Sequence, residues 1–165
     1  MARRTVSLPV EIDGVRETLA AFRRLPKEAS QSLRERTLTL AELLARSAKA
    51  AGRSAGPQAA LVAGTVKAKR DRVPAVTVGG SGAVGRHRAP VYGLLFASEF
   101  GMNRRSGWYS ASRYGGSAGQ QYHPHIGTQG YWFYPTLRRQ GPAIGRAWTA
   151  VADDIIEEFS EGGAG

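Results

Sequence analysis

Three short stretches of the sequence carry residue types and spacings that could do chemistry. The first is "GSGAVG", residues 80–85, which matches the G-x-G-x-x-G pattern of dinucleotide-binding loops. In such loops a helix opens beside the glycines, so that its N-terminal amides can hold a pyrophosphate. Here "RHRAP" follows, with Pro90 and no helical pattern. We therefore interpret residues 79–88 as a flexible loop.

The other two stretches contain the histidine pair and an isolated acid. His123 and His125 stand two residues apart and could chelate a metal in an extended segment, but no carboxylate occurs between residues 100 and 152 to complete a site. A polar loop tip is the favoured interpretation. Glu99 would need a carboxylate or histidine partner to act as a general acid or base. We favour a structural role for it, paired with Arg138 or Arg139.

Other catalytic patterns are missing from the sequence. It contains no G-x-S-x-G, no H-E-x-x-H and no G-x-x-x-x-G-K-[ST]. It has no cysteine, which removes disulfides, thiolate zinc sites and cysteine nucleophiles. We therefore predict that the chain is not an enzyme and uses no cofactor and no metal.

The charge of the chain is strongly positive and unevenly distributed. Its 165 residues, expected to form one domain, carry a net charge of +10. No acidic residue lies between Glu99 and Asp153, whereas residues 142–165 hold one arginine and five acids. The basic part could meet nucleic acid, or the acidic end of another copy of the same chain. The N-terminus lacks the apolar run of a signal peptide, and no stretch approaches the roughly twenty apolar residues of a membrane span.

The N-terminal half predicts a strand, two helices and a hairpin. Residues 5–13 alternate with period two, and Pro9 indicates an edge strand. Asp13 is expected to cap a short helix, and a long helix is expected at 27–51, ended by Gly52. Its apolar stripe consists of Ala29, Leu33, Leu40, Leu43, Leu44 and Ala48. Two strands are expected next, Val62 to Lys69 and Val73 to Val78.

The C-terminal half is less regular. Residues 90–101 fit either a two-turn helix or a buried strand, and residues 102–130 predict a long loop rich in glycine, arginine and aromatic residues. A closing helix is expected from Pro142, and residues 161–165 are expected to fray. Its stripe consists of Ile144, Trp148, Val151, Ile155 and Phe159. Together these elements predict an α+β fold, in which the long helix and the closing amphipathic helix pack against a small antiparallel sheet.

Two phrases of the sequence resemble a known family. In "YGLLFASEFG", residues 92–101, Tyr92, Ala97 and the Glu99–Gly101 triplet stand at the places typical of the neck and tail-completion proteins of long-tailed bacteriophages. In "WFYPTLRR", residues 132–139, aromatic residues, a proline, a leucine and a basic residue follow in the order that family shows. The order of elements is similar over nearly the whole chain. The sequence departs from the family at "SAGPQAALVAGTV", which matches the family's turn after the long helix only loosely, and in the length of the loop.

The resemblance implies a structural protein of the virion. Such proteins form a ring, here expected to be hexameric, at the head–tail junction. They join head-side connector or stopper proteins to the tail terminator or tail tube, and DNA passes through the channel without sequence-specific contact. Tail completion, terminator and head-closure roles remain open, and the protein would occupy the host cytoplasm during assembly.

A ring subunit must bury a different patch against each neighbour, and Trp, Tyr and Arg are typical interface anchors. Phe133, Pro135 and Leu137 are expected instead to pack under the sheet. The alternative function is a basic nucleic-acid-binding protein that uses the arginines and aromatic rings of residues 102–122. The interface candidates are Glu99, Arg104, Arg105, Trp108, Tyr109, Arg113, Tyr122, Tyr131, Trp132, Arg138 and Arg139.

Overall fold

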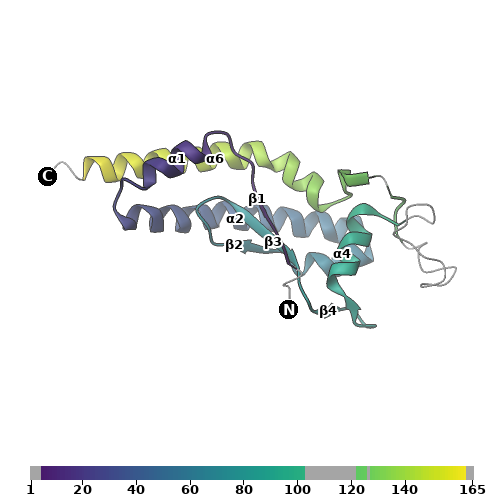
Figure 1. Ribbon diagram of the computed structural model, residues 1–165. Coiled ribbons are helices and arrows are strands. Elements are labelled where there is room, and N and C mark those ends of the chain that lie inside the picture. The colour runs from purple at the N-terminus through teal and green to yellow at the C-terminus, as the bar shows by residue number, and fades with distance from the viewer. Residues whose placement is uncertain (1–4, 103–121, 126, 163–165) are drawn as a thin grey trace. The chain divides into compact units, whose positions relative to one another are not determined.

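The computed structural model describes residues 5–102, 122–125 and 127–162 and has the expected α+β fold (Figure 1). Five α-helices accompany a three-stranded sheet and a two-stranded sheet in these residues. In chain order the elements are β1 (Thr5–Pro9), α1 (Val15–Phe22), α2 (Lys27–Ala55), α3 (Pro57–Ala63), β2 (Lys67–Lys69), β3 (Ala75–Gly79), β4 (Ala83–Val84), β5 (Ala89–Pro90), α4 (Val91–Phe100), the 3-10 helix η1 (Gly127–Gln129) and α6 (Phe133–Glu161).

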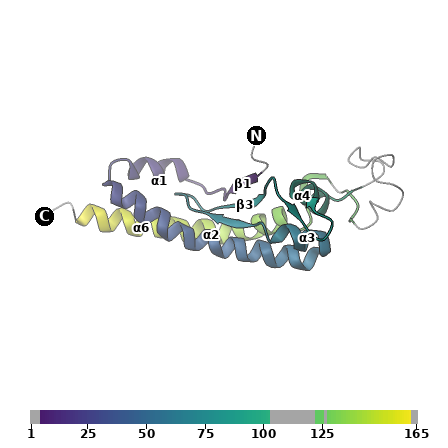
Figure 2. The ribbon, with the colours of Figure 1, turned by 90° about the horizontal axis from the view of Figure 1, so that it is seen from below.

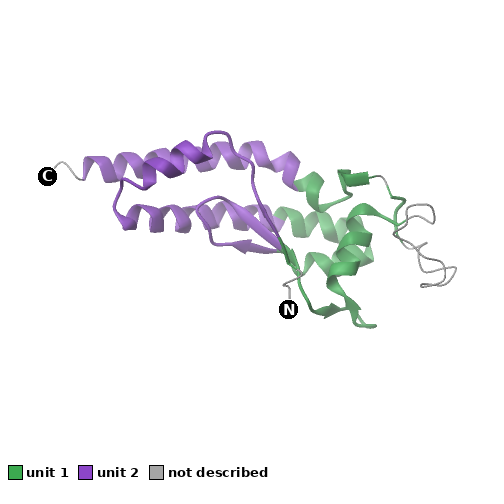
Figure 3. Cartoon of the chain, in the orientation of Figure 1, with its two compact units in different colours: residues 1–6, 47–66, 78–136 green, residues 7–46, 67–77, 137–165 purple. Residues whose placement is uncertain are grey.

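The chain divides into two compact units, coloured separately in Figure 3. Unit 1 consists of residues 1–6, 47–66 and 78–136, and unit 2 consists of residues 7–46, 67–77 and 137–165. Each unit is built from segments far apart in the sequence. The expectation of one domain over residues 1–165 stays a prediction.

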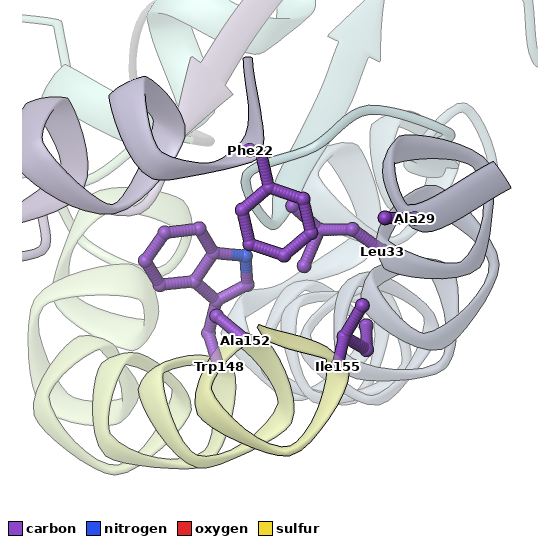
Figure 4. Close-up of a cluster of buried hydrophobic side chains, with 6 residues drawn as sticks. All are labelled: Phe22, Ala29, Leu33, Trp148, Ala152 and Ile155. Carbon is purple, nitrogen blue, oxygen red and sulfur yellow. The ribbon is translucent and has the colours of Figure 1, made fainter. Parts of the chain in front are cut away.

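Unit 2 has its core between α1, the first part of α2 and the part of α6 from Trp148 to Phe159. In both ribbon views α2 and α6 run side by side here (Figures 1 and 2). The buried cluster consists of Phe22, Ala29, Leu33, Trp148, Ala152 and Ile155 (Figure 4). Trp148 is fully buried, and its indole N–H donates to the carbonyl of Arg72 at 2.7 Å. Ala29 and Leu33 of the first expected stripe, and Trp148 and Ile155 of the second, therefore lie in this core.

One residue of these stripes lies elsewhere. Leu43 remains 45% exposed, whereas its neighbour Leu44 is fully buried. Successive residues of an α-helix point about 100° apart, so both cannot face the same core. The prediction that Leu43 belongs to the apolar face was wrong.

The three-stranded sheet has the order β1-β3-β2, so β1 is an edge strand, as Pro9 predicted. Strands β2 and β3 are antiparallel, with Lys67 opposite Thr77 and Lys69 opposite Ala75. Beyond the strand, the amide of Val10 donates to the carbonyl of Pro74 at 2.8 Å.

The segment between α2 and β2 differs from the prediction of a strand from Val62 to Lys69. A helix, α3, occupies Pro57–Ala63, and only Lys67–Lys69 form a strand. Pro57 suits the first position of a helix because an N–H at that position would have no acceptor within the helix, so proline loses nothing by lacking it. Ala59, Val62 and Ala63 are buried at helical spacing, which two-residue alternation would not produce.

Two predicted helix boundaries were also wrong. Helix α1 begins after Gly14, whose φ of 76° allows the chain to turn, and no Asp13 side-chain cap forms. Helix α2 runs through Gly52 to Ala55, and Gly56 at φ 139° follows it. A β-carbon at position 52 would lie 2.6 Å from the β-carbon of Ala63 and 2.9 Å from the Trp132 ring. Gly52 is therefore explained by close packing within unit 1.

The last helix begins nine residues before the predicted start, at Phe133, with Pro142 inside it. Pro135 lies in the first turn, where backbone N–H groups have no partner within the helix. The missing N–H of proline therefore costs no hydrogen bond there. Pro142 has no N–H to donate to the carbonyl of Arg138, yet the helix continues on both sides. Pro142 and Arg138 are exposed, so water can hydrogen-bond to that carbonyl.

The glycine-rich stretch folds as a small hairpin. Strands β4 and β5 are antiparallel, with Ala83 opposite Pro90 and Val84 opposite Ala89. The amide of Arg88 donates to the carbonyl of Gly85 at 3.2 Å and closes the turn. A turn, and no helix, follows the third glycine of the G-x-G-x-x-G pattern, so the geometry of a dinucleotide loop does not form here.

Candidate functional site

The two phrases that carry the family resemblance come together in unit 1, through the side chain of Glu99. This residue stands near the end of α4, and its Oε2 accepts hydrogen bonds from the backbone amides of Trp132 at 3.1 Å and Phe133 at 2.8 Å. Its Oε1 accepts from the amide of Tyr134 at 2.8 Å. Glu99 is 1% exposed. Both carboxylate oxygens are thus used to hold the first residues of α6.

This arrangement follows from the chemistry of a helix start. The first amides of a helix have no partner within the helix, and the aligned peptide dipoles place a partial positive charge there. A carboxylate satisfies several of these donors at once and opposes that charge. The contact joins residues 33 to 35 positions apart, so it acts as a long-range version of an N-cap.

Two glycines make the approach possible. Gly130 has a φ of 76°, and a β-carbon there would collide with Oε1 of Glu99 and lie 3.2 Å from Pro135. Gly101 follows α4 with a φ of 74°, and a β-carbon there would collide with the carbonyls of His123 and Pro124. Both positions require glycine for conformation and for space.

Backbone hydrogen bonds align the same two segments. The amide of Tyr131 donates to the carbonyl of Glu99 at 2.8 Å, and the amide of Met102 donates to the carbonyl of His123 at 2.8 Å. The Tyr131 hydroxyl also donates to the carbonyl of Pro124. The end of α4 is therefore tied to the segment before α6 by main chain and side chain alike.

Trp132 occupies the interior beside Glu99. It is 2% exposed, and its indole N–H donates to Oγ of Ser98 at 3.2 Å. The Thr136 hydroxyl donates to the carbonyl of Trp132 at 2.7 Å. The ring also lies against Gly52, where a side chain would collide with it. The indole is thus enclosed by α2, α4 and the first turn of α6.

Aromatic rings continue from this buried centre to the surface of unit 1. Trp132 contacts Phe133 at a centroid distance of 5.5 Å, and Phe133 contacts Tyr134 at 5.9 Å. Phe100 lies 5.7 Å from Tyr134, and Phe96 lies 5.9 Å from Phe100. Phe96 is 39% exposed. The concentration of aromatic residues around the prolines and glycines therefore builds one continuous cluster.

Both histidines of the predicted loop tip interact with protein groups. The ring of His123 stacks on Tyr131 at 4.7 Å, and Nδ1 of His125 lies 2.8 Å from the carbonyl oxygen of Phe100. Within residues 5–102, 122–125 and 127–162, no three His, Cys, Asp or Glu side chains gather closely enough to hold a metal ion.

The predicted interface residues fall into three groups. Arg104, Arg105, Trp108, Tyr109 and Arg113 lie outside the described residues, as do most of the predicted loop and the last three residues of the predicted frayed tail. Tyr122 and Tyr131 are half-buried, and Arg138 and Arg139 are exposed on α6. These four stay candidates.

Glu99 and Trp132 form the third group, and here the prediction needs correction. Both are buried within the chain, whereas an interface anchor must be accessible in the free subunit. They support the surface from inside instead. The sequence signals that could have revealed this were an acid inside an apolar helix and a glycine immediately before the aromatic run. The suggested pairing of Glu99 with Arg138 or Arg139 stays a prediction.

No protein-family model matches the chain, and neither the curated proteins nor the solved structures include a match to it. None of the helices in the described part of the chain has the length and apolar character needed to cross a membrane.

Proposed function

We propose that this chain is a structural virion protein of a long-tailed bacteriophage. In this proposal, copies of the chain form a hexameric ring at the head–tail junction, between the head connector proteins and the tail tube or its terminator. DNA passes through the lumen of the ring without sequence-specific contact. The protein acts by binding other proteins and catalyses no reaction.

The observation that supports the proposal most strongly is the use of Glu99. It is the one acid in the first of the two resembling phrases, and its three amide partners belong to the second. The two phrases therefore contact each other and form a single structural motif, which supports reading them together. Because backbone donors occupy both carboxylate oxygens, the motif orients α6 and the aromatic cluster instead of presenting a reactive group.

The surroundings of this motif fit a docking role. Leu61 is 41% exposed and Phe96 is 39% exposed, both in unit 1, and each offers apolar surface that a partner could bury. The rigid support beneath Phe96 is suited to an interface because little side-chain freedom is lost when a partner binds.

Deletion of the coding sequence from the phage genome that carries it tests the proposal. We expect the host to release DNA-filled heads and separate tails, seen by negative-stain electron microscopy, and a large fall in infectious titre. A plasmid copy of the gene should restore joined particles. Infectious particles with firmly attached tails in the absence of the gene would refute the proposal. In parallel, tight DNA binding by the purified protein with a steep salt dependence would favour a nucleic-acid-binding function instead.

A further inference from the structure

The exposed face of α6 carries opposite charges on its two halves, within unit 2. Arg139 and Arg146 occupy its N-terminal part, and Asp154 and Glu161 occupy its C-terminal part, all four exposed. Exposed alanines at positions 143 and 150 alternate with the arginines, and Asp153 and Glu157 continue the stripe. At 100° per residue these positions fall within an arc of roughly 100°, so they form one continuous face. We call residues 139, 143, 146, 150, 153, 154, 157 and 161 the charged stripe.

The arrangement of the charged stripe is self-complementary. When the helix is laid antiparallel on a second copy, with the two-fold axis at Ala150, Arg146 stands opposite Asp154 and Arg139 stands opposite Glu161. Every arginine of the stripe then faces an acid, and the small Ala150 side chains meet at the axis. Antiparallel helices in contact need small or complementary side chains along their shared line, and this face provides both.

Among the described residues, no ion pair neutralises the charges of the stripe. The ion pairs of the described residues join Arg36 to Glu158, Lys69 to Asp71 and Arg70 to Glu35, and none includes a residue of the stripe. Residues three and four positions from Arg139 and Arg146 along α6 are uncharged. At the other end Asp153, Asp154 and Glu157 stand close together, and like charges at such spacing repel one another. Arg146 of a second copy, opposite Asp154, would offset part of this repulsion.

We propose that the charged stripe of α6 is a homodimer interface, in which two copies pair antiparallel about a two-fold axis at Ala150. The pairing joins identical surfaces, unlike the head-to-tail contacts of a ring, and it does not depend on the proposed function. Its binding free energy comes mainly from exposed ion pairs, so the dimer is weak and sensitive to salt. A contact of this kind suits a protein that must separate again when it binds its final partners.

Cysteine crosslinking tests the position of the axis, because the natural sequence contains no cysteine. In the proposed dimer the two copies of residue 150 are adjacent, whereas the two copies of residue 143 are about 21 Å apart along the helices. We expect Ala150→Cys to give a covalent dimer in high yield with a short bis-maleimide at low salt. Ala143→Cys and the exposed Ala20→Cys of α1 should give only the collisional background.

Charge reversal tests the pairing itself by sedimentation equilibrium. We expect Arg146→Asp to weaken dimerisation at least about tenfold. In this variant, residue 146 of each copy is an aspartate that faces Asp154 of the other copy, so like charges meet at both sites. The double variant Arg146→Asp/Asp154→Arg should restore the affinity to within about threefold, since the reversed pair is again complementary. Increasing NaCl from about 50 to 500 mM should weaken the natural dimer by a similar factor.

All of these positions are exposed, so circular dichroism should show unchanged folding. The proposal is overturned if Ala150→Cys crosslinks no better than Ala20→Cys, if the chain stays monomeric at low salt, or if the double variant fails to regain the affinity lost in Arg146→Asp. None of these results depends on the phage deletion, so failure of this proposal and failure of the proposed function remain distinguishable.

Discussion

Replacing Glu99 with glutamine tests the role of the buried carboxylate. The variant keeps the size of the side chain and removes its charge. One carboxylate oxygen becomes an NH₂ group, which cannot accept a hydrogen bond and would face a backbone N–H of the α6 start. The remaining oxygen can still serve two of the three amides that Glu99 now holds.

The expected cost follows from these contacts. A hydrogen bond to a charged group contributes about 1.5–3 kcal/mol, and a neutral one about 0.5–1.5 kcal/mol. One charge-assisted bond is lost, two become neutral, and the interaction with the helix dipole disappears. Because such terms are not additive, we expect Glu99→Gln to lower the free energy of unfolding by about 3 kcal/mol.

The matched control is Glu28→Gln. Glu28 also lies in the first turn of a helix, α2, but it is exposed, so its interaction with the helix dipole is screened by water. We expect this control to change the stability by no more than about 0.5 kcal/mol.

Urea denaturation followed by tryptophan fluorescence measures both variants. With a slope of about 2 kcal/mol per molar urea, Glu99→Gln should lower the midpoint by about 1.5 M. Amide hydrogen exchange at residues 132–134 gives a local readout, and protection there should fall specifically in this variant. A Glu99→Gln protein with the midpoint and the exchange protection of Glu28→Gln would refute the cap.

Three further substitutions test the packing, and urea denaturation measures each of them. Gly130→Ala should cost at least about 2 kcal/mol more than Gly127→Ala, because both glycines have positive φ but only Gly130 touches Glu99; equal costs would exclude the close approach. Gly52→Ala should cost about 1–3 kcal/mol through overpacking, whereas Gly64→Ala, with a φ of −60° and only an ordinary contact at 3.5 Å to the carbonyl oxygen of Leu61, should change little; a neutral Gly52→Ala would contradict the packing within unit 1. Trp148→Ala should cost about 3–5 kcal/mol through its cavity, and unchanged stability would show that the core of unit 2 is wrongly assigned.

The α+β fold and the long helices could be predicted from periodicity. The stripe from Ile144 to Phe159 and the Ala29–Leu33 part of α2 recur at helical spacing, and the core of unit 2 is built from them. Pro9 likewise marks an edge strand because proline cannot donate to a neighbouring strand.

Local rules failed where packing overrides them. Gly52 resembles a helix stop, but the helix passes through it because Trp132 and Ala63 occupy the space beside it. Pro142 resembles a helix start, but the helix continues through it. Pro142 and Arg138 are exposed, so water can hydrogen-bond to the carbonyl that lacks a helical donor. In both cases the local preference costs only a few kcal/mol, less than the burial of the helix's apolar side chains contributes.

The site itself was predicted in part. Both phrases and the isolated Glu99 stand out in the sequence, but their residue types do not predict that Glu99 holds the backbone amides of the second phrase. That contact joins residues more than thirty positions apart. Its donors are backbone amides, which every residue type except proline carries, so residue identity does not reveal them. The start of a helix carries a partial positive charge, so it is electrostatically complementary to a buried carboxylate, as an arginine would be.

The most direct test of the proposed role is to locate and count the chain in purified virions. Quantitative mass spectrometry, calibrated against a capsid protein, should find several copies per particle, and cryo-electron microscopy should show a ring of density at the head–tail junction into which α2 and α6 fit. Purified infectious virions that contain no copy of this chain, or copies located away from the junction, would contradict the proposed role.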